Sequence, residues 1–328
     1  MHISYSRFSS YLNCPYGHYL HYVEKLKRKR PSRPLSFGSD FHKLLQFRGG
    51  PKALKKAKVE IGDTYYAMPA SWQTDLGDDY VQDLSVIFSD YQEIYKEHPV
   101  PKITEEPFEI PLGKFKGEPV NFVGVIDELY LLKKGGEKFI KIGEHKTFSR
   151  KPDMDVLVMN TQKCLYSKAT QILRGIFPRA VIWDYIKSTP AKSPVWLEKS
   201  GRFSDAKSKD ITPFSWLRAC QERGITDPNT LSKSKNYQDN LDEFFFRVEM
   251  DMYPGMVENV WEGFLYTCKQ IAKYGETNKT KKLSRDCSWC DYRDICHAEL
   301  TGCNRNSVID RDYTCEENEV QETTEEKY

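Results

Sequence analysis

Two carboxylates and a lysine stand on neighbouring strand-like segments: Asp127 ends the run GVID, and Glu144 and Lys146 belong to the run GEHK. Side chains two residues apart on a strand face the same side, so Glu144 and Lys146 project together, and a hairpin would bring Asp127 to that side. Carboxylate oxygens bind hard divalent cations, and a lysine beside them can orient or activate water. Metal-dependent cleavage of a phosphodiester needs this chemistry. A simple cross-strand ion pair is the alternative for these three residues alone.

Two polar residues one helical turn apart follow the lysine strand, Gln162 and Tyr166 in the run QKCLY. Residues four apart lie on one face of a helix. A helix packed across the sheet would bring that face to the acids, where an amide and a hydroxyl can hydrogen-bond phosphate oxygens or bases. The alternative is a polar pair that faces solvent.

His42 lies upstream, in the run GSDFH, on an expected helix. An imidazole added to two carboxylates gives a ligand set for a divalent metal, whereas a histidine packed in the core is the ordinary alternative. Glu106, on the strand before Asp127, can add negative charge behind these ligands. Glu105 and Glu109 compete with it for that role.

Three of the nine cysteines, Cys287, Cys290 and Cys296, have C-x2-C-x5-C spacing. The number is odd and the amino terminus does not resemble a secretory signal, so we do not expect a disulfide framework. Cysteines this close together indicate a metal site.

The fourth ligand of that site decides its type. His297 or Cys303 would favour zinc, whereas Cys14 would favour an iron–sulfur cluster that joins the two ends of the chain. We expect Trp289 and Tyr292 to cover the cluster.

Hydrophobic periodicity predicts alternating helices and strands around these residues. We expect helices over residues 4–12, 39–47, 75–97, 155–174, 213–222 and 254–274, and strands over residues 103–112, 120–132, 139–148, 180–186 and 243–250. Ser4 is a suitable helix N-cap, and Cys14-Pro15 should end the first helix. The order predicts an α/β fold with a mixed central sheet flanked by helices.

Composition is ordinary for a soluble globular protein of 328 residues, with 39% hydrophobic residues, 29% charged residues and a net charge of +2. No apolar run approaches the roughly 20 residues of a membrane helix. We therefore expect no membrane partner and an intracellular, cytoplasmic location. The chain has no G-x-x-x-x-G-K-S/T motif, so no nucleotide-hydrolysing motor is expected within it.

Charge is unevenly distributed along the chain. Residues 25–33 are basic, residues 188–235 are rich in lysine, and the segment after Asp310 is acidic. We expect residues 304–328 to form a disordered acidic tail. We expect residues 188–238 to be an insertion that either contacts DNA or is an ordinary part of the protein surface.

Together these motifs resemble the RecB-like branch of the PD-(D/E)XK nuclease superfamily, in the iron–sulfur form found in AddB and in CRISPR-associated and phage-encoded RecB-like exonucleases. The matching motifs are S-x-S-x-F-x-x-Y-x-x-C-P at 4–15, G-x-x-x-H at 38–42, GVID at 124–127, EHK at 144–146, Q-x-x-x-Y at 162–166 and the three late cysteines. The resemblance therefore spans residues 4–296.

The resemblance implies a restriction-endonuclease-like core with a C-terminal iron–sulfur clasp. One domain would cover residues 1–303, with a core at 36–187, an insertion at 188–238 and a C-terminal helix and cluster region at 239–303. Mg²⁺ or Mn²⁺ would be bound by His42, Asp127 and Glu144, water positioned by Lys146, and DNA held by Gln162 and Tyr166. A 4Fe-4S cluster would be held by Cys14, Cys287, Cys290 and Cys296.

The implied activity is a Mg²⁺- or Mn²⁺-dependent deoxyribonuclease that digests DNA from its ends, on single strands or free ends. Recombination, repair and phage DNA metabolism use such enzymes, alongside recombination or helicase partners, in the cytoplasm of bacteria or phage-infected hosts. One alternative is a non-catalytic DNA-binding or recombination-assembly protein that keeps the nuclease fold. Another is a zinc-ribbon module on an unrelated α/β body.

Overall fold

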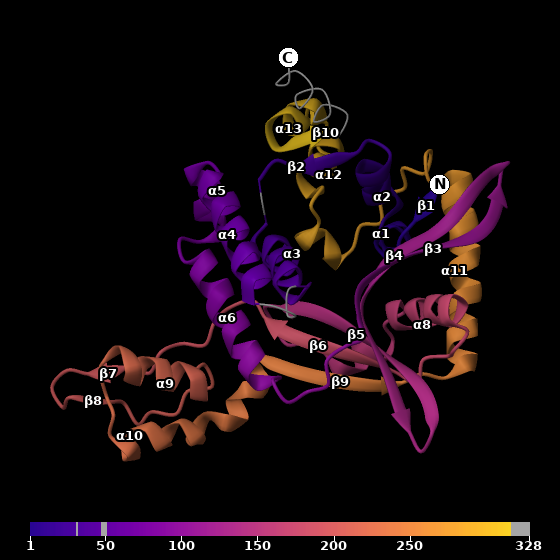
Figure 1. The fold of residues 1–328 in the computed structure, drawn as a ribbon. Coiled ribbons are helices and arrows are strands. Elements are labelled where there is room, and N and C mark those ends of the chain that lie inside the picture. The colour runs from indigo at the N-terminus through magenta and orange to yellow at the C-terminus, as the bar shows by residue number, and fades with distance from the viewer. Residues whose placement is uncertain (31, 47–50, 316–328) are drawn as a thin grey trace.

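The computed structural model describes residues 1–30, 32–46 and 51–315. At its centre lies a mixed sheet in the order β1-β4-β5-β6-β9, with β3 also paired to β4 (Figure 1). Its strands are His2–Ile3, Ile103–Phe115, Glu118–Lys134, Glu137–Phe148, Ala180–Lys187 and Phe245–Asp251, numbered β1, β3, β4, β5, β6 and β9. β1 runs parallel to β4 and β5 parallel to β6, whereas the other pairs are antiparallel. The predicted mixed α/β fold is confirmed.

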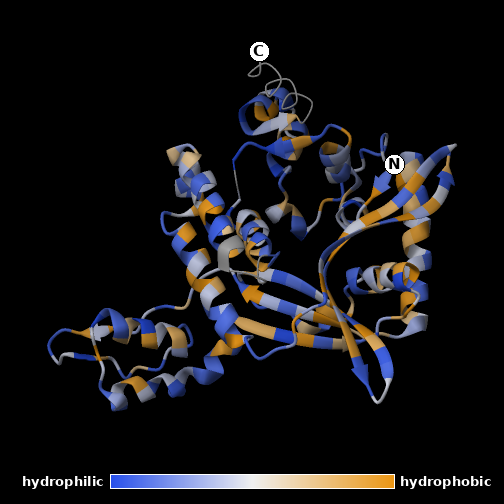
Figure 2. Ribbon diagram, in the orientation of Figure 1, coloured by the Kyte–Doolittle hydropathy of each residue, from blue (hydrophilic) through white to orange (hydrophobic). Residues whose placement is uncertain are grey.

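Helices cover both faces of the sheet (Figure 1). The helices of the two flanking layers are α1 (Tyr5–Asn13), α3 (Arg33–Gln46), α4 (Pro51–Ala67), α5 (Ala70–Leu76), α6 (Tyr80–Ile94), α7 (Met154–Val158), α8 (Gln162–Arg174) and α11 (Pro254–Tyr274). α8 and α11 share one core with the sheet, and α3, α4 and α6 form a second core. Hydrophobic and hydrophilic residues alternate along these helices, as amphipathic packing requires (Figure 2).

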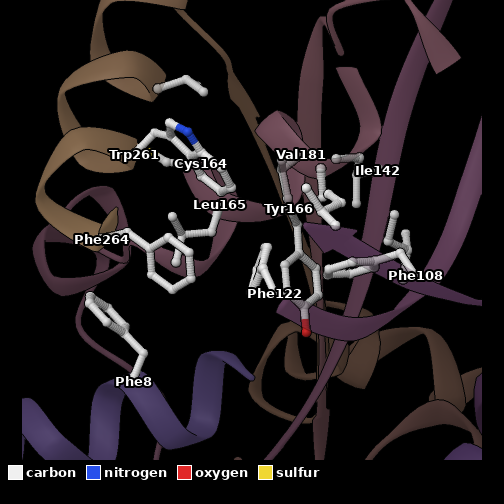
Figure 3. Packing of buried hydrophobic residues seen from close by; sticks show 14 of the residues in the cluster. Phe8, Phe108, Phe122, Ile142, Cys164, Leu165, Tyr166, Val181, Trp261 and Phe264 are labelled. Atoms are coloured by element: carbon white, nitrogen blue, oxygen red, sulfur yellow. The ribbon is translucent and has the colours of Figure 1, made fainter. Parts of the chain in front are cut away.

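The larger core holds α8 and α11 against the strands that carry the acids (Figure 3). Trp261 and Phe264 of α11 contact the ring of Phe122 on β4, and Phe264 also contacts Phe8 of α1. Burying each such side chain contributes about 1.5–3 kcal/mol. Because Leu165 is fully buried in this core, it fixes the rotation of α8.

Two expected helices, 213–222 and 254–274, are found with those bounds as α9 and α11. The helix expected over 155–174 is instead two helices, α7 and α8. Asn160 explains the break, because its Oδ1 accepts a hydrogen bond from the backbone nitrogen of Gln162 at 2.8 Å. This side chain supplies an acceptor for an amide at the start of α8.

The insertion forms a small unit with its own core, in which Trp216 stacks on Tyr237 and contacts Phe203. It contains β7 (Trp196–Leu197), β8 (Arg202–Phe203), α9, α10 (Pro228–Ser232) and a 3-10 helix over Lys233–Glu243. It projects from the ends of β6 and β9 (Figure 1). Arg218 forms an ion pair with Asp90 of α6 and so ties the insertion to the body.

The two ends of the chain form a third region, made of α2 (Pro15–Tyr22), β2 (Leu26–Arg28), a 3-10 helix over Arg285–Trp289, α12 (Arg293–Leu300), α13 (Arg305–Asp312) and β10 (Tyr313–Cys315). The disordered tail expected from residue 304 differs from the structure over 304–315, because β10 pairs antiparallel with β2 and Tyr313 is buried. The rest of that tail, 316–328, lies outside the described residues. Within the described ranges, none of the helices has the length and apolar character that crossing a membrane would need.

Candidate active site

The acids lie where β4 separates from β5. The two strands pair from Lys134↔Glu137 to Glu128↔Gly143, and the ladder stops before Asp127. Asp127 Oδ2 instead accepts a hydrogen bond from the backbone nitrogen of His145 at 2.8 Å. The carboxylate thus takes the place of a strand carbonyl, which satisfies a buried N–H and fixes Asp127 beside β5.

Glu144 is buried and has one satisfied and one unsatisfied oxygen. Oε1 accepts hydrogen bonds from Lys146 Nζ at 2.7 Å and from Gln162 Nε2 at 2.6 Å. Oε2 is buried without a hydrogen-bond partner among the described residues. Burial raises the pKa of Glu144 to about 7, against the opposing charge of Lys146. A buried carboxylate oxygen without a donor fits a cation ligand.

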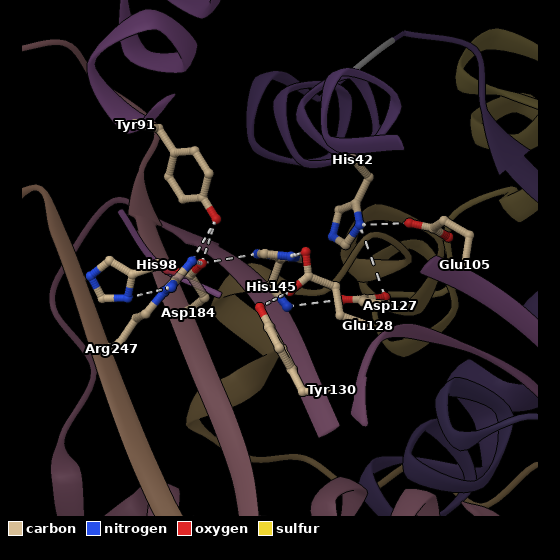
Figure 4. A network of polar contacts seen from close by, with 10 residues as sticks. All are labelled: His42, Tyr91, His98, Glu105, Asp127, Glu128, Tyr130, His145, Asp184 and Arg247. Atoms are coloured by element: carbon tan, nitrogen blue, oxygen red, sulfur yellow. Dashed lines mark hydrogen bonds and ion pairs between the residues drawn. The ribbon is translucent and has the colours of Figure 1, made fainter. Parts of the chain in front are cut away.

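His42, Glu105 and Asp127 converge (Figure 4), and the charges of Asp127 and His42 act on Glu144. His42 Nδ1 lies 3.6 Å from Glu105 Oε1 and 4.0 Å from Asp127 Oδ1. One ligand atom from each residue lies within 4.8 Å of the others. Carboxylates and an imidazole in this arrangement fit a divalent metal such as Mg²⁺ or Mn²⁺.

Glu105 joins this group, and Glu106 does not. Glu106 forms an ion pair with Arg174 of α8, so the prediction that it adds charge at the acids differs from the structure. Glu105 has φ of 51°, and the β3–β4 pairing skips it opposite Asp127. Positive φ is uncommon outside glycine. This backbone conformation, rather than any pattern in the run of glutamates, directs Glu105 toward His42 and Asp127.

Gln162 and Tyr166 are brought to the acids by α8, as their spacing predicts. Gln162 contacts Glu144 directly, and burial raises the pKa of the Tyr166 hydroxyl, with a further contribution from the charge of Glu144. Gly124 makes the close approach of Tyr166 to β4 possible. A Cβ there would lie 3.3 Å from the Tyr166 hydroxyl and 2.6 Å from the ring of Phe108.

The chain matches the family model of the PD-(D/E)XK nuclease superfamily over residues 2–297. It belongs to this superfamily. The matched region contains the fork between β4 and β5, helix α3 with His42, and helix α8, so the convergent acids lie within it.

Two solved structures resemble this PD-(D/E)XK chain at low sequence identity. A crystal structure from Eubacterium rectale, described as that of a candidate exonuclease, is 9% identical, with 88% of each chain covered and a TM-score of 0.47. The crystal structure of SSO0001 is 12% identical, with 90% of this chain and 86% of that chain covered and a TM-score of 0.33. No curated protein matches the sequence.

The four cysteines of the predicted cluster line one cavity of about 690 Å³ in the region formed by the chain ends. They are Cys14, Cys287, Cys290 and Cys296, and all are free thiols. Backbone nitrogens lie 3.4 to 3.5 Å from three of the sulfurs, in position to donate to them: those of Cys14, Cys287 and Cys290. N–H groups directed at sulfur fit a set of metal-bound thiolates.

The other candidate ligands differ in position. His297 also lines the cavity, whereas Cys303 is exposed and its sulfur accepts a hydrogen bond from Thr301. The expectation that Trp289 covers the cluster is wrong, because its side chain is 87% exposed. Tyr292 is held inward by a hydrogen bond from its hydroxyl to Leu26 O at 2.9 Å.

A charged cluster on the opposite face of β5 has no counterpart in the sequence predictions. His145 faces away from Glu144 and lies between Glu128 and Asp184. Burial alone would lower the pKa of His145, yet its contacts with Asp184 and Glu128 raise it to about 9. Burial would likewise raise the pKa of Asp184, but His145 and Arg247 hold it well below its usual range.

Proposed function

We propose that this superfamily member is a metal-dependent DNA exonuclease of the RecB-like, iron–sulfur type. One observation carries the proposal: His42, Glu105 and Asp127 converge beside Glu144, whose second oxygen is buried without a donor in the described structure. A plain cross-strand ion pair would need only Lys146 and one acid. It would not explain why an imidazole and further carboxylates gather at the same point.

His42, Asp127 and Glu144 would hold Mg²⁺ or Mn²⁺, with Glu105 as an additional ligand. When bound, the metal lowers the pKa of water and offsets the negative charge that develops on the phosphate. Lys146 is half-exposed and its ammonium is fixed by Glu144. Contact with Glu144 raises the pKa of Lys146, against the effect of burial, so the side chain stays protonated. It would therefore orient the attacking water through an N–H donor.

Gln162 and Tyr166 would position the DNA strand. Gln162 keeps its amide nitrogen on Glu144, and its carbonyl and the nearby Tyr166 hydroxyl would contact the substrate. Burial raises the pKa of that hydroxyl, so it stays protonated and can donate to a phosphate oxygen.

The cysteine cavity would hold a 4Fe-4S cluster through Cys14, Cys287, Cys290 and Cys296. The cluster would join α1 and α2 to the segment that carries α12. Because α1 packs on α11 through Phe8 and Phe264, the cluster would stabilise the packing of these helices on the nuclease core. A zinc site that uses His297 is the alternative, and metal analysis distinguishes zinc from an iron–sulfur cluster.

The proposed activity is tested by digestion of end-labelled linear DNA, single- and double-stranded, with Mg²⁺, Mn²⁺ or EDTA. We expect mononucleotides or short products from linear DNA, none with EDTA, and no cleavage of a closed circle of the same sequence. Cleavage of the closed circle would show an endonuclease instead. Binding of DNA without cleavage under every metal condition would support the non-catalytic DNA-binding protein.

A further inference from the structure

The charged cluster behind the acids joins four strands and one helix (Figure 4). His145 Nε2 lies 3.0 Å from Glu128 Oε1, and His145 Nδ1 lies 3.3 Å from Asp184 Oδ2. Glu128 stands on β4, His145 on β5 and Asp184 on β6. The imidazole on β5 therefore contacts one carboxylate on each of the two neighbouring strands, β4 and β6.

Each of these carboxylates also accepts hydrogen bonds from other side chains. Asp184 Oδ2 accepts from Tyr91 of α6 at 2.5 Å and from Arg247 of β9 at 2.7 Å. Glu128 Oε2 accepts from the Tyr130 hydroxyl at 2.5 Å. The two carboxylates are thus held between one imidazole and one guanidinium.

The backbone is shaped to admit this cluster. A Cβ on Gly143 would lie 2.9 Å from Glu128 Oε2 and 3.0 Å from the ring of Tyr130. Only a glycine at this position of β5 lets the Glu128 carboxylate lie over the strand. The cluster is consequently built into the sheet at the last paired position before the fork.

The same residue, His145, also holds the acid on the other face. Its backbone nitrogen donates to Asp127 Oδ2 at 2.8 Å, and its neighbour in sequence is Glu144. The position of His145 between β4 and β6 therefore helps to set the distance between Asp127 and Glu144. A shift of β5 relative to β4 would move both acids.

We propose that His145 is a positioning residue for the metal centre: its imidazole clamps Glu128 and Asp184, and so fixes the fork that spaces Asp127 and Glu144. It ligates neither metal nor substrate, and it acts through the strands and through ring contact with His42, whose ring centroid lies 6.0 Å from its own. The inference rests on the proposed nuclease function, and it concerns the geometry of the metal ligands rather than the cleavage step itself.

The test is Mn²⁺ binding by calorimetry to the full chain, well below its unfolding temperature. Residues that orient metal ligands typically contribute about 10- to 100-fold in metal affinity. We expect His145→Gln to raise the Kd for Mn²⁺ by about 10-fold or more, and to lower kcat with little change in the KM for DNA. His98→Gln is the matched control, because the His98 ring contacts Arg247 at the edge of the same cluster. Its Kd should equal that of the wild type.

The double variant His145→Gln/Glu128→Gln addresses misfolding. Because both members of the His145–Glu128 pair are replaced together, neither is left without its partner, so we expect the unfolding temperature to return toward wild type while the Kd for Mn²⁺ stays raised. A wild-type Kd in either folded variant would overturn the proposal. A wild type that binds Mn²⁺ but cleaves no DNA would overturn the proposed function instead, and the binding comparison would still decide the role of His145.

Discussion

Lys146 Nζ lies 2.7 Å from Glu144 Oε1 and leaves Oε2 of the same carboxylate free of it. One oxygen of the Glu144 carboxylate therefore binds the ammonium of Lys146, and the other is available to a metal. Because the two oxygens have different partners, substitutions of Lys146 and Glu144 should affect water positioning and metal binding differently.

Lys146→Ala should abolish cleavage while Mn²⁺ binding persists. Positioned proton-transfer and water-orienting groups contribute about 10²- to 10⁴-fold to rate, so we expect a loss of at least ~10²-fold in kcat. Glu144→Ala should lose both cleavage and Mn²⁺ affinity. Calorimetry and the end-labelled DNA assay measure the two quantities separately.

Lys141→Ala is the matched control, on the same strand. Lys141 pairs with the half-exposed Glu249 at 2.7 Å, and such pairs contribute about 0–1 kcal/mol. Its cleavage rate should be unchanged. Full activity of Lys146→Ala would show that another group orients the water.

Adjacent glutamates should differ sharply in their effect on metal binding. Glu105→Gln should weaken Mn²⁺ binding by about 10-fold, because Glu105 lies beside His42 in the convergent group. Glu106→Gln should leave the Kd unchanged, since Glu106 contacts Arg174. The opposite ranking in a titration would place Glu106, rather than Glu105, beside the proposed metal ligands.

Gly124→Ala should destabilise the fold and reduce activity together. The added Cβ would meet the ring of Phe108 at 2.6 Å, and extra atoms in a packed core cost about 1–3 kcal/mol. Urea unfolding measures this loss. Gly62→Ala is the control, because its Cβ would meet nothing within 4 Å on helix α4. There we expect a gain of about 0.5–1 kcal/mol, and equal effects of the two substitutions would contradict the packing argument.

Cys14→Ser should remove the visible absorbance and the iron of the purified protein, and lower its unfolding temperature, because metal binding contributes to folding. Cys303→Ser should retain both, since Cys303 is exposed and does not line the cavity. Iron and sulfide analysis checks the outcome. A colourless wild type with one zinc per chain would identify the site as zinc and leave the nuclease centre unaffected.

Much of the site follows from local periodicity. Glu144 and Lys146 share a strand face, and Gln162 lies on the helix that returns over it, so the sequence pattern predicted which side chains meet. The position of Asp127 required only that β4 and β5 form a hairpin. These relations depend on residues close in the chain, which is why they could be read from the sequence.

The remaining features depend on tertiary contacts or on single backbone angles. Glu105 is directed toward His42 and Asp127 by a positive φ that no residue pattern predicts. His145 meets Asp184 only because β6 lies parallel to β5, and the residues around Tyr313 are ordered by strand β2. Disorder was predicted there from the acidic composition, which carries no information about strand pairing with the opposite end of the chain.

That partner has a consequence for biosynthesis. β2, near the amino terminus, pairs with β10, and β1 pairs with β4. On the ribosome, the first helices emerge long before the segments that cover them, and such distant contacts form late. This part of the amino-terminal region must therefore wait for nearly complete translation, and a ribosome-stalled chain ending before α12 would expose the apolar face of α2, whose Tyr16 and Leu20 share a core with Ile295 of α12.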